Sequence, residues 1–138
     1  MLSNTISYFA TITTAVAVNS IAVGLGESII SKGALKGIDI QPSAKTEINK
    51  VTLLGLALTE TSAIIGLVIS MILISEPITH PYAGLGLIGI ALAICIPGFA
   101  IGIASALPIT KACLSVARQP FFSNKIINIM LITVSFIQ

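Results

Sequence analysis

Two carboxylates that lie in apolar sequence are the residues whose chemistry most needs an explanation. Glu60 is the only charged residue in the stretch 51–75, and it follows Lys50 by ten residues. In a helix that begins near Lys50, this separation corresponds to about 15 Å, which places Glu60 near the midplane of a bilayer. An ionised side chain at that depth costs at least about 2.5 kcal/mol. We therefore expect Glu60 to be protonated, paired or bound to a cation.

Glu27 is expected to lie at the same depth as Glu60. In an antiparallel hairpin, positions of equal depth have a constant sum, and the midpoint of 27 and 60 is 43.5, just after Gln41-Pro42, where a turn is expected. Two carboxyls that close together do not both ionise readily, so they would share a proton or hold a cation between them. The alternatives are that Glu27 is an interfacial charge and that Glu60 is a structural polar contact between helices.

Two hydroxyl residues, Thr61 and Ser62, directly follow Glu60. Their oxygens could coordinate a hard cation such as Na⁺. Hydroxyls in membrane helices also bond to carbonyls of their own helix or join neighbouring helices. Position alone leaves both interpretations open.

The composition indicates which elements must position these carboxylates. Of the 138 residues, 55% are apolar and only 9% are charged, with a mean hydropathy of +1.06. A soluble domain carries about 25% charged residues, so this composition predicts a multi-span membrane protein. A net charge of +2 without a basic stripe disfavours nucleic acid as a partner. Two cysteines, Cys95 and Cys113, are too few for a disulfide scaffold.

Three apolar stretches, at 4–30, 51–75 and 83–108, are long enough for a helix that crosses a bilayer. A fourth stretch, 126–138, has only 13 residues, and we expect it to be a truncated span. The predicted fold is an all-α membrane protein of two tandem transmembrane helical hairpins, which assemble into a ring. Lys and Arg are confined to 31–50 and 109–125, whereas the opposite loop at 76–82 has none. The positive-inside rule therefore places both basic loops in the cytoplasm and the N-terminus outside.

The two hairpins match each other at an offset of 78 residues. Gln41-Pro42 aligns with Gln119-Pro120, and further identities are Gly24 with Gly102, Ala34 with Ala112 and Ile48 with Ile126. This repeat favours duplication of one hairpin, with one unit at 1–78 and an incomplete second unit at 79–138.

The loop and carboxylate motifs together resemble those of one known family. Ala117-Arg118-Gln119-Pro120 forms one loop, Ile40-Gln41-Pro42 forms the other without its arginine, and Glu60 follows Gln41 by 19 residues at the end of Leu53-Leu54-Gly55-Leu56-Ala57-Leu58-Thr59-Glu60. This combination resembles the proteolipid (c) subunit of F-type and V-type rotary ATP synthases. The resemblance implies a homo-oligomeric ring in a bilayer, expected to be the bacterial plasma membrane. It also implies contacts with a stator (a) subunit and central stalk subunits, and no cofactor besides the transported Na⁺ or H⁺.

The resemblance also assigns roles to single residues. Glu60 matches the ion-binding carboxylate, Glu27 falls where sodium-binding members carry Gln or Glu, Thr61 falls on a hydroxyl ligand, and Leu58 on a backbone-carbonyl ligand. Together, Glu27, Glu60 and Thr61 resemble a sodium site, although Ile65 stands where many sodium-binding members have Tyr; on this basis we favour Na⁺ over H⁺. Stalk contact is expected from the loops at 37–46 and 115–122, through Gln41, Pro42, Arg118, Gln119 and Pro120.

The second repeat lacks both acids. Gln138 stands at the position equivalent to Glu60, and Ser105 stands at the position equivalent to Glu27. An amide does not take up and release a proton, and the chain resembles duplicated V-type-like proteolipids, in which only one hairpin of two keeps its acid. This resemblance implies a ring that carries fewer ions per turn, which suits ATP-driven pumping.

The expected function is that of a membrane rotor-ring subunit that binds its ion reversibly at Glu60. The chain has no phosphate-binding Gly-Lys-Ser/Thr loop, so we expect nucleotide chemistry in other subunits and no enzyme activity here. One alternative is a small four-helix proton-coupled solute transporter that uses Glu60. A content of 5% aromatic residues with no Trp disfavours an organic-cation substrate. A structural proteolipid without transport would leave the paired acids unexplained.

Overall fold

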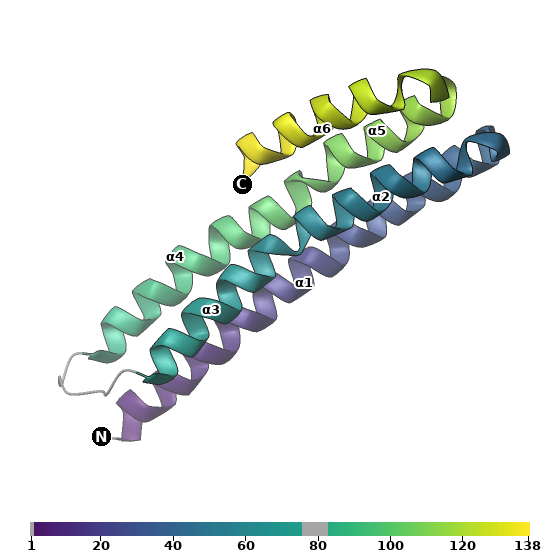
Figure 1. Ribbon diagram of the computed structural model, residues 1–138. Coiled ribbons are helices and arrows are strands. Elements are labelled where there is room, and N and C mark those ends of the chain that lie inside the picture. The colour runs from purple at the N-terminus through teal and green to yellow at the C-terminus, as the bar shows by residue number, and fades with distance from the viewer. Residues whose placement is uncertain (1, 76–82) are drawn as a thin grey trace.

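The computed structural model describes residues 2–75 and 83–138, and in these ranges all regular structure is helical. Figure 1 shows the helices in chain order. They are α1 (Leu2–Ile40), α2 (Lys45–Thr59), α3 (Thr61–Ser75), α4 (Ala83–Ala104), α5 (Ala106–Arg118) and α6 (Ser123–Ile137), with short 3₁₀ turns at Pro42–Ala44 and Pro120–Phe122.

Four segments of the described chain are long and apolar enough to cross a membrane: Thr5–Ile40, Pro42–Ser75, Gly86–Arg118 and Pro120–Ile137. The all-α membrane fold predicted from the sequence is therefore confirmed. The helix α1 runs antiparallel to α2–α3, and α4–α5 runs antiparallel to α6, which covers α5 (Figure 1). The predicted outer loop at 76–82 lies outside the described residues.

The helices extend further toward the turns than the sequence predicted. Residues 31–40 belong to α1 and are not part of a loop, because Lys32 and Lys36 lie on its exposed face while Gly33 and Gly37 are buried. The fourth span was expected to be too short, but its apolar segment begins at Pro120 and has 18 residues. The positions of charged residues therefore gave helices that were too short, because one face of a helix can carry charged side chains while the opposite face packs against other helices.

The two turns have the same hydrogen-bond pattern. The N–H of Gln41 donates to the Gly37 carbonyl at 3.0 Å, and the N–H of Gln119 donates to the Ser115 carbonyl at 2.9 Å. A proline follows each glutamine and begins a 3₁₀ turn, where its missing N–H leaves no bond unmade. The two bonds are separated by 78 residues, which is the offset of the predicted repeat.

Two long helical spans are interrupted by a single residue. Ser105 separates α4 from α5. Pro108 explains this interruption, because it has no N–H to offer the Ala104 carbonyl and its ring crowds that oxygen. Glu60 separates α2 from α3, and its carbonyl accepts bonds from the N–H groups of Ala63 and Ile64, both at 3.1 Å.

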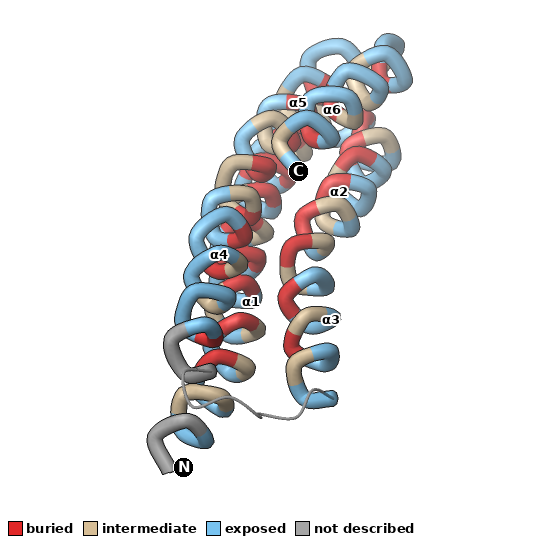
Figure 2. The backbone as a smooth tube through the Cα atoms, turned by 90° about the vertical axis from the view of Figure 1, so that its left-hand side faces the viewer, coloured by how far each residue is buried: buried red, intermediate tan, exposed pale blue. Residues whose placement is uncertain are grey.

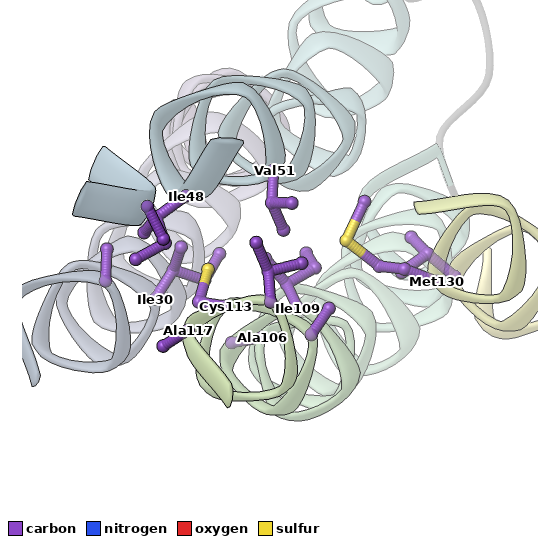
Figure 3. Packing of buried hydrophobic residues seen from close by; sticks show 13 residues of the cluster. Ile30, Ile48, Val51, Ala106, Ile109, Cys113, Ala117 and Met130 are labelled. Atoms are coloured by element: carbon purple, nitrogen blue, oxygen red, sulfur yellow. The ribbon is translucent and has the colours of Figure 1, made fainter. Parts of the chain in front are cut away.

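The main apolar core cluster lies in the half of the bundle nearest the turns, and Figure 3 shows how its side chains pack between the helices. Side chains from α1, α2, α5 and α6 meet there, and the fully buried members with the largest side chains are Ile30, Ile48, Val51, Ile109, Cys113, Val116 and Val134. Figure 2 shows that exposed residues cover the outer sides of the helices, and many of these are large and apolar, such as Leu53, Met71 and Ile96. An apolar outer surface is suited to lipid or to neighbouring helices.

Glycine allows the two hairpins to approach closely. A Cβ at Gly26 of α1 would overlap the backbone carbonyl of Gly102 on α4, and a Cβ at Gly102 would lie 3.0 Å from the Ala22 side chain. Backbone atoms cannot rotate away as a flexible side chain can. The pair therefore sets the distance between α1 and α4.

We expect Gly26→Ala to lower the free energy of unfolding by about 1–3 kcal/mol, since the methyl group would push α1 away from α4. The loss is measured as a decrease in the midpoint of thermal unfolding of the purified protein in detergent. Gly89→Ala is the matched control on α4, because a Cβ there meets nothing within 4 Å. Equal midpoints for the two variants would contradict the close approach.

Candidate ion-binding site

Glu27 and Glu60 line the same groove, which opens between α1 and α3 and has a volume of about 370 Å³. Glu27 is half-buried, whereas Glu60 is exposed at the α2–α3 junction. The remaining lining residues are Val16, Ser20, Val23, Gly24, Ala63, Ile64 and Leu67. The structure therefore places Glu27 and Glu60 in one groove, as expected for two residues at the same depth of an antiparallel hairpin.

The groove offers these carboxylates no positive partner. None of its lining residues is Lys, Arg or His. The single salt bridge of the described chain is elsewhere, where the Lys50 ammonium contacts the Glu47 carboxylate at 2.8 Å. Apart from Ser20, the other residues that line the groove are apolar, so a cation that entered it would meet two carboxyl groups and no competing positive side chain.

Leu58 and Thr61 lie away from this groove, together with Gln138. The Thr61 hydroxyl donates a hydrogen bond to the Leu58 carbonyl at 2.7 Å, and the Gln138 side-chain amide donates to the same oxygen. Thr61 and Gln138 also line a separate cavity. Within one chain, the four predicted ion ligands are thus divided between two places, Glu27 with Glu60 and Leu58 with Thr61.

Ser105, at the position equivalent to Glu27, is fully buried, and its hydroxyl donates to the Gly102 carbonyl at 3.3 Å. The second hairpin therefore places a satisfied hydroxyl where the first places an acid.

The residues predicted to contact a stalk lie at one end of the bundle, where both turns are found (Figure 1). Pro42, Arg118 and Gln119 are exposed, while Gln41 and Pro120 are half-buried. The Gln41 amide donates to the Ser43 hydroxyl at 3.0 Å. Sequence reasoning did not single out Phe121, whose side chain is 100% exposed at the second turn.

Asn19 was also missed by sequence reasoning. Its side chain is buried between the hairpins, and its amide has no hydrogen-bond partner among the described residues. The available signal was its type and position, because it is the only Asn between Thr5 and Ile48, in the middle of an apolar stretch.

Comparison with known proteins identifies the family of the first hairpin. Residues 11–73 match the family model that describes the C subunit of ATP synthase. The ATP synthase c-subunit of Syntrophobacter fumaroxidans is 33% identical over 75 residues, which cover 51% of this chain and 83% of that relative. The chain belongs to the ATP synthase c-subunit family. Another c-subunit, from Ruminiclostridium cellulolyticum, is 41% identical over 58 residues, or 42% of this chain and 76% of that relative. The ATP synthase c-subunit of Prochlorococcus marinus strain AS9601 is 38% identical over 60 residues, or 44% of this chain and 74% of that relative.

Membership in the c-subunit family confirms the resemblance seen in the loop and carboxylate motifs. It also confirms the expectation of an ion-translocating, multi-pass membrane protein that is not itself an enzyme. The match to the family model includes Glu27, Gln41, Leu58, Glu60 and Thr61, whereas the second hairpin lies beyond the matched residues.

Proposed function

We propose that this chain is a rotor-ring subunit of a rotary ATP synthase or ATPase, and that it carries Na⁺ or H⁺ by reversible binding at Glu60. The observation that carries the proposal is the pair of carboxyls, Glu27 and Glu60, in one apolar groove without a countercharge. Membership in the c-subunit family supports ion translocation, and the groove supplies the group that would hold the ion. No cofactor besides the transported ion is required.

In this function Glu60 alternates between a charged and a neutral state. An ion would enter from a half-channel in the stator (a) subunit and neutralise the carboxylate. The neutral site can then face lipid as the ring turns, since an ionised side chain there would cost at least about 2.5 kcal/mol. At the second half-channel the ion leaves, and a cationic group of the stator would stabilise the empty carboxylate.

The repeat suggests how a neighbouring copy completes the groove. Within one chain, the Leu58 carbonyl of the first hairpin meets Gln138 of the second. Gln138 is equivalent to Glu60 at the 78-residue offset, and Phe136 is equivalent to Leu58. In a ring of alternating hairpins, the Phe136 carbonyl of the next copy would therefore approach Glu60. Leu58 and Thr61 would then belong to the site around Gln138 and would not be ligands of the ion at Glu60. That ion would be bound by oxygen atoms from two neighbouring copies of the chain.

Two carboxylates and a carbonyl favour Na⁺ as the cargo. Hard cations bind oxygen ligands. When both are ionised, Glu27 and Glu60 carry two negative charges, and a single proton would neutralise only one of them. A Na⁺ ion together with one proton shared by the pair would leave the groove neutral. We therefore keep Na⁺ ahead of H⁺.

The experiment that tests this function is carbodiimide labelling of the purified protein with and without Na⁺, read by peptide mass spectrometry. Carbodiimide modifies a protonated carboxyl in an apolar setting, so we expect label on Glu60 and protection by Na⁺. Equal labelling in both conditions would make the site a proton site. If Glu60 takes no label at pH values near neutral, the proposed ion site is wrong.

The turn end of the bundle is proposed as the cytoplasmic, stalk-facing end. Positive side chains gather there, and the exposed ring of Phe121 offers an apolar contact for a partner. By the positive-inside rule, the N-terminus is then on the outer side of the membrane. The membrane is proposed to be the bacterial plasma membrane. The stalk subunits would receive torque through Gln41–Ala44 and Gln119–Phe122.

A further inference from the structure

Two buried polar side chains remain without partners inside the bundle. Asn19 of α1 is 1% exposed and Ser62 of α3 is 4% exposed. Neither the amide oxygen and nitrogen of Asn19 nor the hydroxyl of Ser62 has a hydrogen-bond partner in the described part of the chain. The buried hydroxyls of Thr59 and Ser70, in contrast, donate to the carbonyls of Gly55 and Gly66. Buried polar groups are nearly always satisfied, so Asn19 and Ser62 require a partner.

Both side chains line one cavity between α1, α3 and α4, with a volume of about 200 Å³. A water molecule occupies about 30 Å³ of liquid, so the cavity has room for several. Thr61 and Gln138 also contribute to its wall. The remaining lining residues are Ile65, Ile69, Ala93, Ile94, Pro97, Gly98 and Ile101. It shares no lining residue with the Glu27–Glu60 groove.

The helices are shaped around the Asn19 amide. A Cβ at Gly66 of α3 would lie 2.6 Å from the amide nitrogen, and a Cβ at Gly98 of α4 would overlap the amide oxygen. Glycine at both positions therefore leaves the space that the amide fills. Three helices from both hairpins hold this polar group at the cavity wall.

The chemistry of the wall selects the ligand. Asn19 offers both N–H donors and an acceptor oxygen, and Ser62 can donate or accept. No charged side chain lines the cavity. A bare cation would leave the Asn19 nitrogen unpaired, and an anion would leave its oxygen unpaired. The Thr61 hydroxyl and the Gln138 amide already donate to the Leu58 carbonyl. A small neutral ligand that both donates and accepts satisfies every free group.

We propose that this cavity is a binding site for ordered water, which links Asn19 of α1 to Ser62 of α3 beside Gly98 of α4. The water provides the hydrogen bonds that the helices leave unmade, and it joins α1 to α3, the two sides of the first hairpin, through a polar contact in an otherwise apolar region. This site is independent of the ion bound at Glu60 and does not require the proposed rotor function.

The test is water-edited solid-state NMR of the whole protein in lipid bilayers, with uniform ¹⁵N labelling, so that asparagine side-chain amides and backbone amides are both observed. Asn19→Leu identifies the Asn19 signal by its loss, and exposed Asn49 serves as the internal reference for contact with water. We expect polarisation to pass from water to the Asn19 amide about as fast as to Asn49. Ser62→Ala, a small change, should slow that transfer several-fold.

Two outcomes would overturn the proposal. If the Asn19 amide receives polarisation only as slowly as the backbone of buried Ile30, the cavity is dry. If transfer to Asn19 is fast but unchanged in Ser62→Ala, water is present without the bridge between α1 and α3. Neither result depends on ion binding, so neither bears on the function proposed for Glu60.

Discussion

Glu60→Gln is expected to abolish ion translocation and to remove carbodiimide labelling at this position, while the chain remains folded. Gln is almost the same size as Glu, and residue 60 is exposed at a helix junction, so its replacement disturbs little packing. An amide neither exchanges a proton near neutral pH nor balances the charge of Na⁺. Transport should therefore fall to background. The measurement is ATP-driven ion uptake by the whole complex in vesicles.

The matched control for Glu60→Gln is Glu47→Gln. Glu47 lies near the turn end of α2, where its carboxylate contacts the Lys50 ammonium at 2.8 Å, outside the groove. Removing that contact should leave transport and Glu60 labelling unchanged. Transport that survives Glu60→Gln would exclude residue 60 as the ion carrier, whereas equal loss in both variants would point to a general defect in assembly.

Gln138→Glu is expected to give the chain a second carbodiimide-reactive carboxyl. In the wild-type chain, the Gln138 amide donates to the Leu58 carbonyl. An ionised carboxylate at position 138 would place its acceptor oxygens next to the Leu58 carbonyl oxygen, with no hydrogen between them. The new acid should therefore be protonated, or a cation should bridge it to Leu58. Protonated and beside a cavity wall that has no charged side chain, it should react as Glu60 does. Peptide mass spectrometry would then show label in the C-terminal peptide as well as at Glu60.

Gln41→Glu provides the same chemical change in a different setting. Gln41 lies at the turn, next to exposed Pro42 and Ser43, where an acid stays ionised and does not react. We expect no new label there. If Gln138→Glu also takes no label, the second hairpin does not form a carboxylate site equivalent to the first. In vesicles, the Gln138→Glu variant should also carry more ions for each ATP hydrolysed.

The fold and the central pair of acids could be predicted from the sequence because both depend on simple distances. Apolar length determines where a helix can cross a bilayer, and the midpoint of Glu27 and Glu60 coincides with the observed turn at Pro42–Ala44. The helix ends were less predictable, since Lys32 and Lys36 are accommodated on the exposed face of α1. The break at Ser105 follows from Pro108.

The places of Leu58 and Thr61 could not be predicted in the same way. Spacing along one helix does not reveal which side of it the other hairpin packs against. In the structure, α6 brings Gln138 to Leu58, so the two predicted ligands face the second hairpin and not Glu27. The unpaired amide of Asn19 was equally hidden, because its environment is made by Gly66 and Gly98 on two other helices.

The hydrogen bond between Gln138 and Leu58 has a consequence for the energy of a turning ring. If each chain contributes two hairpins, the position occupied by Gln138 is neutral at every angle and meets no electrostatic barrier at the lipid or at the stator. Only Glu60 would meet an electrostatic barrier, and only after its ion has been released. The rotational energy profile would therefore repeat once per chain rather than once per hairpin, and each ion released would have to drive the rotor through an arc two hairpins wide.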